Sequence, residues 1–238
     1  MRQSILKVTA GGILLFAFAI LSGQGSFHDL VMNAFGLDQD LVNGVQYYYR
    51  YFQTEGHPYF LEDRFNTGSV TINGRVFQNV KLKYDLYSQH VEIEYEFLSG
   101  GSNLILAVPE HMSAFTIGKY NFRKLKLTEV PERFYQVIHN ARFTCFIYWE
   151  KKLVPYNNNT VYLYHFTNPE NLYYLELDGE IKAFNNRRTF VKLFPEGIQK
   201  RLMKHLRQLD VSFRSTNPDE IIRTINSIAT LYNTESHL

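Results

Sequence analysis

The sequence predicts an α+β fold, mainly an antiparallel β-sheet of about ten strands with two C-terminal helices. Apolar and charged residues alternate between positions 80 and 97, which is typical of a half-buried strand. Asn-Gly and Asp-Gly pairs separate short apolar runs, as in tight hairpins. After Pro195 the apolar spacing becomes helical. We expect a hairpin meander or a curved, barrel-like sheet, with helices over about residues 195–235.

The N-terminus has the pattern of a secretory signal peptide. Arg2 and Lys7 flank the start of an uncharged run from Val8 to Leu21, and small residues follow it. An uncleaved anchor is the alternative, but the run has 14 residues and a helix needs about 20 to cross a bilayer. We divide the chain into a signal peptide at 1–24 and one domain at 25–238, exported to the periplasm or associated with the outer membrane.

The charge and the cysteine content bear on two questions: whether the protein binds nucleic acid and whether it is anchored as a lipoprotein. The chain has 25 basic and 23 acidic residues, and removing Arg2 and Lys7 leaves 23 of each. A balanced chain does not predict a nucleic-acid partner, which calls for a basic patch or stripe. The single cysteine, Cys145, lies in an apolar run and cannot form an internal disulfide. Because no cysteine follows the apolar run of the signal region, we do not expect a lipoprotein.

The clearest β signal is a hairpin centred on Asn73-Gly74. This pair suits a type I′ turn, in which both central residues need positive φ. The second strand of the hairpin continues to residue 86, and Phe77 is out of phase with its other apolar residues. A β-bulge near Gln78-Asn79 would return Phe77 to the apolar face.

The next strand, residues 91–97, is expected to pair with residues 80–86 across a loop at 87–90. Its apolar residues would then lie on one face and its glutamates on a solvated face, as in an antiparallel sheet. Matching of apolar residues and of opposite charges predicts one register. In this register the opposite pairs are Leu86–Val91, Tyr84–Ile93, Leu82–Tyr95, Lys83–Glu94 and Lys81–Glu96.

The remaining elements follow from shorter patterns. Asp178-Gly179 predicts a second tight hairpin. Further strands are expected at 47–52, 104–108, 115–117, 120–122, 134–138, 143–149, 161–166, 173–177 and 180–184. One helix follows Pro195-Glu196, and another begins after Asn217, with Pro218 at its first position.

No catalytic, nucleotide-binding or metal-binding motif is found in the sequence, so we expect neither a cofactor nor a metal, and we favour a non-enzymatic protein over an enzyme with a spatially assembled site. The eight histidines have no metal-ligand spacing. Glu92, Glu94 and Glu96 share a strand face, where two carboxylates could serve a glycosidase. Pairing with Lys81 and Lys83 explains the same glutamates without catalysis.

Two groups of residues are candidate binding sites. The first is aromatic and could bind a glycan or a peptide through exposed rings; packing in the core or at an edge is the alternative. The second is basic, lies on one face of the helix after Pro195, and could meet an anionic membrane surface or an acidic partner; a solvated helix face is the alternative. The aromatic candidates are Tyr47, Tyr49, Tyr51 and Tyr59, and the basic candidates are Lys200, Lys204 and Arg207.

The stretch from Thr67 to Asp85, followed later by Asn217-Pro218-Asp219, resembles an uncharacterised family of signal-peptide-bearing β-rich envelope proteins of Bacteroidota. The resemblance implies a compartment and a fold, and its motifs are structural rather than catalytic. We therefore expect a non-enzymatic exported cell-envelope protein, a soluble accessory or binding component that docks on an envelope protein complex or a glycan. A carrier of a lipid or other apolar ligand, and a hydrolase with a spatially assembled site, are the alternatives.

Overall fold

The computed structural model describes residues 44–96, 102–127, 131–157, 161–211, 213 and 215–235. The signal peptide expected at 1–24 lies outside these residues. No helix among them is long and apolar enough to cross a membrane.

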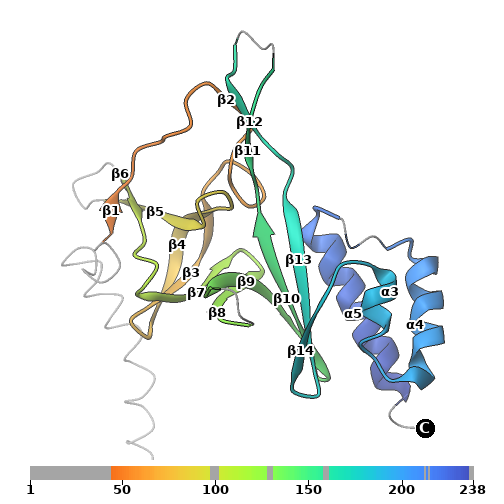
Figure 1. Cartoon of the computed structure of the whole chain (residues 1–238). Coiled ribbons are helices and arrows are strands. Elements are labelled where there is room, and N and C mark those ends of the chain that lie inside the picture. Colours follow the sequence, from red (N-terminus) through yellow and green to blue (C-terminus); the bar gives the residue numbers. More distant parts are fainter. Residues whose placement is uncertain are drawn as a thin grey trace, which may run out of the picture.

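Two β-sheets form most of the molecule (Figure 1). The strands of the large sheet are β1 (Val45–Gln46), β3 (Asn66–Ile72), β4 (Arg75–Asp85), β5 (His90–Glu96), β6 (Ser102–Leu106), β7 (Met112–Ile117), β8 (Tyr120–Leu125), β9 (Arg133–His139), β10 (Phe143–Glu150), β13 (Glu170–Leu177) and β14 (Glu180–Phe184). The small sheet consists of β11 (Leu153–Pro155), β12 (Tyr164–Phe166) and β2 (Thr54–Glu55).

The large sheet is an open, entirely antiparallel meander with one exchange of neighbours. Its order is β1-β6-β5-β4-β3-β7-β8-β9-β10-β13-β14, so β7 pairs with β3 and not with the preceding β6. The outer strands in this order are β1 and β14. The predicted fold class is confirmed, while the sheet is not closed into a barrel.

Local turn chemistry was predicted correctly. Asn73 and Gly74 have φ of 51° and 78°, and Asp178 and Gly179 have φ of 52° and 80°, as a type I′ turn requires. The predicted β-bulge is at Asn79, which has φ of 57° and is skipped when Gly68 pairs with Val80 and Ser69 with Gln78. The bulge places Phe77 in the core.

The predicted register of β4 and β5 is wrong by two residues. Lys81 lies opposite Glu94, and Lys83 lies opposite Glu92. The turn occupies residues 86–89, one position earlier than expected. Asp85 Oδ1 accepts bonds of 2.8 Å from the backbone N–H of both Tyr87 and Ser88, which stabilises the earlier turn. A slip of two residues leaves each side chain on its predicted face.

The predicted solvated face is also wrong in part, because residues 47–65 cover it around Asp85 and Glu92, both of which are buried. The strand expected at 47–52 is replaced by β1 before it and by β2 after it. Gln53, between this segment and β2, has φ of 54°. Beyond β10, the chain continues into β11 and returns through β12, forming the arm at the top of Figure 1.

Three helices lie beside β13 and β14 at one end of the sheet (Figure 1). The predicted helices are confirmed as α4 (Glu196–Gln208) and α5 (Pro218–Glu235). The short α3 (Arg187–Val191) was not predicted. Asn186 and Thr189 form a capping box at its start, which satisfies the backbone N–H groups of Asn186, Arg188 and Thr189 and stabilises a short helix.

One apolar cluster joins the sheet and the helices into a single core. Its centre consists of aromatic rings in contact: Phe115 stacks on Phe122 with centroids 4.6 Å apart, and Tyr84 meets both rings edge-on. Trp149 donates a 2.8 Å bond to Gln136, so its indole N–H is satisfied in the interior. Cys145 is buried, and burial raises the pKa of its thiol, as expected for an inert core residue.

The close pairing of β3 with β7 predicts that substitution of two glycines by alanine has different effects on stability. A Cβ on Gly68 of β3 would lie 1.8 Å from the backbone oxygen of Thr116, while a Cβ on Gly197 of α4 would meet nothing within 4 Å. We expect Gly68→Ala to lower the free energy of unfolding by more than about 3 kcal/mol. Gly197→Ala should raise it by about 0.5 kcal/mol through helix propensity. Urea unfolding measures both, and equal midpoints would contradict the close approach.

Candidate functional site

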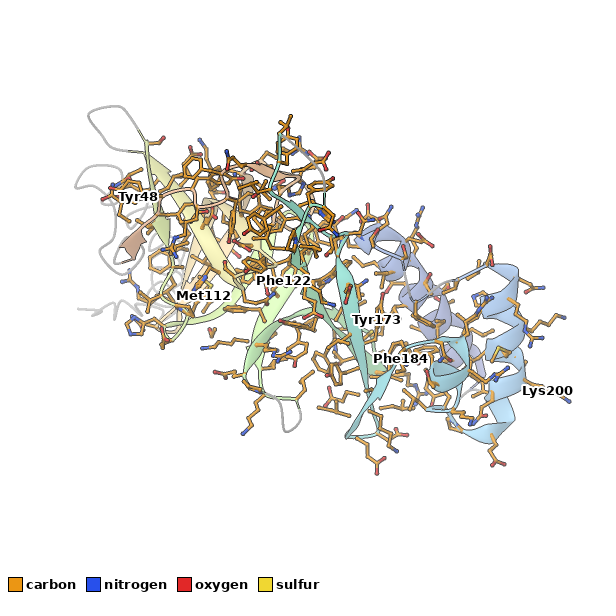
Figure 2. All side chains as sticks on the ribbon, turned by 45° about the horizontal axis from the view of Figure 1, so that its top comes forward. Tyr48, Met112, Phe122, Tyr173, Phe184 and Lys200 are labelled. Atoms are coloured by element: carbon orange, nitrogen blue, oxygen red, sulfur yellow. The ribbon has the colours of Figure 1, made fainter. Side chains whose placement is uncertain are left out.

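The predicted binding residues form two regions, which lie at different ends of the molecule. In Figure 2, Tyr48, which lies in the segment 47–65, and Lys200, which lies on α4, are at opposite ends of the molecule. The aromatic candidates belong to residues 47–65, the segment that covers β4 and β5. The basic candidates belong to α4.

The covering segment is attached by backbone bonds and by one lysine. Phe60 N–H donates to Tyr84 O at 2.8 Å, and Leu86 N–H donates to Pro58 O at 2.9 Å. The Lys83 ammonium lies 4.3 Å from the centroid of the Tyr59 ring and 4.5 Å from that of Phe65. It also forms a 2.6 Å ion pair with Asp63. The lysine expected to pair with Glu94 therefore holds the covering segment instead.

Two buried carboxylates lie beneath this segment, and each accepts a bond from a tyrosine. Glu92 is 1% exposed, and its two oxygens lie 3.0 and 3.2 Å from the hydroxyl of Tyr59. Asp85 accepts a 2.8 Å bond from the hydroxyl of Tyr51. A buried carboxylate without such donors would be strongly destabilising. We call Tyr51, Tyr59, Asp85 and Glu92 the carboxylate cluster.

Burial changes the acid–base properties of the cluster. It raises the pKa of Glu92 to about 7, which the bond from Tyr59 and the charge of Lys83 partly oppose. Burial, and then the charge of Glu92, raise the pKa of Tyr59. Nearby Lys151 donates a 2.7 Å bond to His57 O, and burial lowers its pKa to about 8. A carboxyl group with such a pKa is typical of functional sites, but the Glu92 side chain is buried beneath the covering segment.

The prediction of an exposed aromatic platform is therefore wrong for Tyr47 and Tyr59, both of which are buried. The Tyr47 hydroxyl is also buried, and it lies beside Tyr59 and Glu92, where burial and the charge of Glu92 raise its pKa. Tyr51 is half-buried and directs its hydroxyl inward to Asp85. Of the four predicted tyrosines, Tyr49 alone is exposed, so core packing accounts for most of this group.

A different set of exposed apolar side chains lies where the covering segment meets the arm. Phe52 is 76% exposed and Leu163 is 54% exposed. The adjacent Gln53 carbonyl accepts a 2.8 Å bond from Leu163 N–H, so the two side chains extend from paired chains. The Phe52 ring also contacts Tyr49, with centroids 5.9 Å apart. We call this set the aromatic surface; its members are Tyr49, Phe52, Tyr87, Leu163 and Tyr164.

Sequence reasoning missed Leu163, Tyr164 and Tyr87 as candidate site residues. Residues 161–166 were expected to form a strand within one large sheet, where alternate side chains are covered. Instead, β12 pairs with β11 and β2 in the separate arm. The available signal in the sequence was the apolar run at 161–164 directly after an Asn-rich run, which is typical of a loop.

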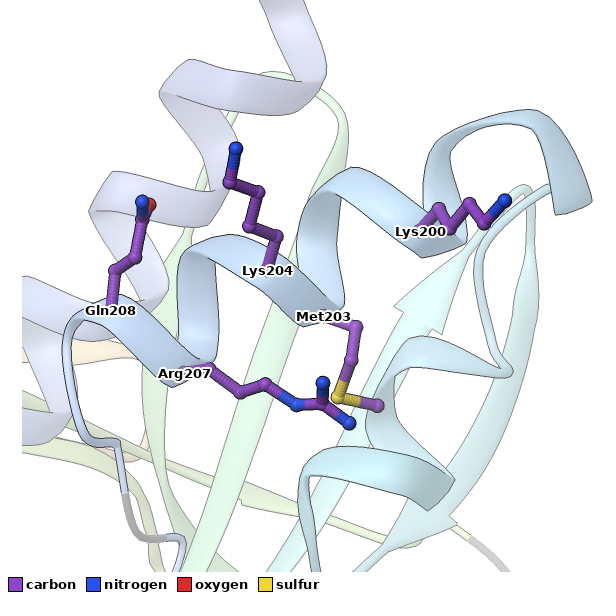
Figure 3. A pocket seen from close by; sticks show the side chains of 5 residues that line it. All are labelled: Lys200, Met203, Lys204, Arg207 and Gln208. Atoms are coloured by element: carbon purple, nitrogen blue, oxygen red, sulfur yellow. The ribbon is translucent and has the colours of Figure 1, made fainter.

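The basic candidates lie together, as predicted. Lys200, Lys204 and Arg207 line an open hollow of about 470 Å³ with Met203 and Gln208 (Figure 3). A second hollow, of about 460 Å³, is lined by Asn186, Arg187, Arg188, Met203 and Arg207. The unpredicted α3 therefore adds two arginines to the basic group.

The described residues include no group of three or more His, Cys, Asp and Glu side chains placed to hold a metal ion. The glycosidase alternative needs two accessible carboxylates. Glu92 is buried, and Glu94 lies 3.8 Å from Lys81. Neither of these two glutamates has the surroundings of a catalytic acid open to a sugar.

The carboxylate cluster predicts a pH dependence of stability. Because the pKa of Glu92 is higher in the folded state, at about 7, the folded state binds this proton more tightly than the unfolded state. Glu92 therefore contributes most to the free energy of unfolding below its ordinary pKa of about 4.5. This contribution falls by about 3 kcal/mol as the pH rises to about 7, and it is constant at higher pH.

Comparison of wild type with Glu92→Gln isolates this effect. Burial lowers the pKa of His57, so His57 contributes a slope of opposite sign in both proteins. We expect the difference in unfolding free energy between the two proteins to change with pH between about 4.5 and 7. The matched control is Glu94→Gln, on the same strand face. Parallel pH profiles for wild type and Glu92→Gln, by urea unfolding, would contradict the assignment.

We compared the chain with known proteins. No family model, no curated protein and no solved structure matches it. No activity, ligand or partner is therefore transferred to it.

Proposed function

We propose that this protein is a non-enzymatic, exported component of the cell envelope that docks on another envelope protein through the aromatic surface. The observation that carries the proposal is the exposure of Phe52 and Leu163 on adjoining chains. Grouped exposed apolar residues mark interaction sites in soluble proteins. Aromatic residues contribute most strongly at the centres of protein interfaces.

The surroundings of the aromatic surface support a protein partner. Among the described residues, β11 and β2 are the outer strands of the small sheet, and an outer strand can present backbone groups to a partner. A partner strand can add main-chain hydrogen bonds at such an edge while its side chains contact the rings. The carboxylate cluster holds the covering segment in place, so the rings are fixed before binding, which lowers the entropic cost of association.

The two alternative functions have less support. A carrier of an apolar ligand needs an internal cavity of about 300–1,000 Å³, whereas rings in contact occupy the centre of the core. A hydrolase needs accessible acid and base groups, and the carboxylate cluster is buried. A glycan is the second candidate partner for the aromatic surface, because tyrosine rings also stack on sugars.

The test is a comparison of purified variants as bait for native envelope extracts. We expect Phe52→Ser with Leu163→Ser to weaken capture of the partner more than about fivefold, since interface anchors contribute more than about 1 kcal/mol each. The matched control is Val76→Ser with Leu172→Ser, which removes two exposed apolar side chains elsewhere. Quantitative mass spectrometry measures retention.

The proposal requires one protein that the wild type and the control retain and the double variant loses. Equal retention by all three baits would overturn it. Fluorescence titration with envelope glycans decides the partner class: saturable glycan binding that disappears in the double variant would replace the protein partner with a glycan.

A further inference from the structure

The two basic hollows adjoin each other on the helical end of the molecule. Met203 and Arg207 line both of them. In Figure 3 the Arg207 guanidinium lies beside the Met203 thioether, while the Lys204 side chain points away from both. Arg207 therefore belongs to the lining of both hollows, and a ligand that extends past its side chain can contact both.

The cations around these hollows have no carboxylate partner in the part of the chain that the structure describes. Arg187, Arg188, Lys200, Lys204 and Arg207 form no ion pair with any carboxylate among the described residues. No acidic side chain of the described ranges lines either hollow. Unpaired cations at one place repel each other, so an added anion is favoured.

The chemistry of the lining favours phosphate over carboxylate. Each hollow brings three cations to one place, counting Arg207 in both. A carboxylate carries one negative charge, whereas a phosphate monoester carries about 1.5 to 2 at pH 7 and three acceptor oxygens. The second hollow presents three guanidinium groups, which bind phosphate oxygens in pairs. The first presents the two ammonium groups, which bind as point charges.

We propose that the two hollows form one binding site for a ligand with two or more phosphate groups, with one group against Arg187, Arg188 and Arg207 and another against Lys200 and Lys204. Both hollows are open to solvent, so the phosphates of a lipid headgroup and those of a soluble molecule can enter equally. The site is independent of the aromatic surface and of the function proposed for it.

Titration of the purified protein with inorganic tripolyphosphate tests the site, with inorganic phosphate for comparison. We expect saturable 1:1 binding of tripolyphosphate by calorimetry, and binding of inorganic phosphate at least about tenfold weaker because it reaches one hollow only. Lys204→Gln with Arg207→Gln should weaken tripolyphosphate binding at least about tenfold. The matched control is Arg123→Gln with Lys126→Gln, which removes the same two kinds of exposed cation from the region of β8.

A third variant, Arg207→Lys, keeps the charge and removes the guanidinium fork. We expect it to bind tripolyphosphate less tightly than wild type and more tightly than the double variant. Co-sedimentation with phosphatidic acid vesicles, against phosphatidylcholine vesicles, identifies the source of the phosphate. Vesicle binding that the double variant loses, without tripolyphosphate binding, would assign a lipid headgroup as the source.

Three outcomes would overturn the proposal. The first is no binding of either tripolyphosphate or phosphatidic acid vesicles. The second is equal weakening in the Lys204/Arg207 variant and in the Arg123/Lys126 control, which would show an effect of net charge alone. The third is equal affinity for phosphate and tripolyphosphate, which would contradict a site with two subsites.

Discussion

The pairing of β3 with β7 is the constraint on which the rest of the structure depends. β3 to β6 form one meander and β7 to β10 another, and this ladder joins them. Gly68 lets the two backbones approach at the joint, and Ser69 N–H donates a 2.9 Å bond to the Thr116 hydroxyl beside it. The covering segment lies on the first half and the helices pack on the second. The joint therefore determines where the aromatic surface and the basic hollows lie relative to each other.

Features encoded by neighbouring residues could be predicted from the sequence, since their physical cause is local. Asn73-Gly74 and Asp178-Gly179 form type I′ turns because both central residues adopt positive φ easily. α4 could be predicted for the same reason, because its buried apolar residues recur at helical spacing in the sequence. The prediction of the register of β4 and β5 was wrong because the register depends on where the turn between them begins. That position is determined by bonds from the Asp85 carboxylate, which the pairing of charges does not reveal.

The candidate site was less predictable, because burial depends on distant segments. The alternation within its strand predicts that Glu92 is solvated, but Tyr59 of the covering segment, 33 residues away, lies over it and donates a hydrogen bond to it. The same contact hides two of the tyrosines expected at the surface. The basic group was predictable in part, since Lys200, Lys204 and Arg207 share a helix face by spacing alone. The contribution of Arg187 and Arg188 required α3, a helix of five residues with no apolar period.

The covering segment connects the two buried carboxylates with the exposed aromatic rings, because the same residues cover the first and carry the second. Two carboxylates on one sheet face would favour solvent, but the hydroxyls of Tyr51 and Tyr59 satisfy them inside. To deliver these hydroxyls, the segment must cross the sheet, and this path carries Tyr49 and Phe52 to the outside next to the arm. Tyr51 links the two layers, since its hydroxyl bonds Asp85 while its ring contacts Tyr49 and Phe166 edge-on, at 5.6 and 5.0 Å. The aromatic surface is thus the outer side of a segment whose inner side is held by buried hydrogen bonds.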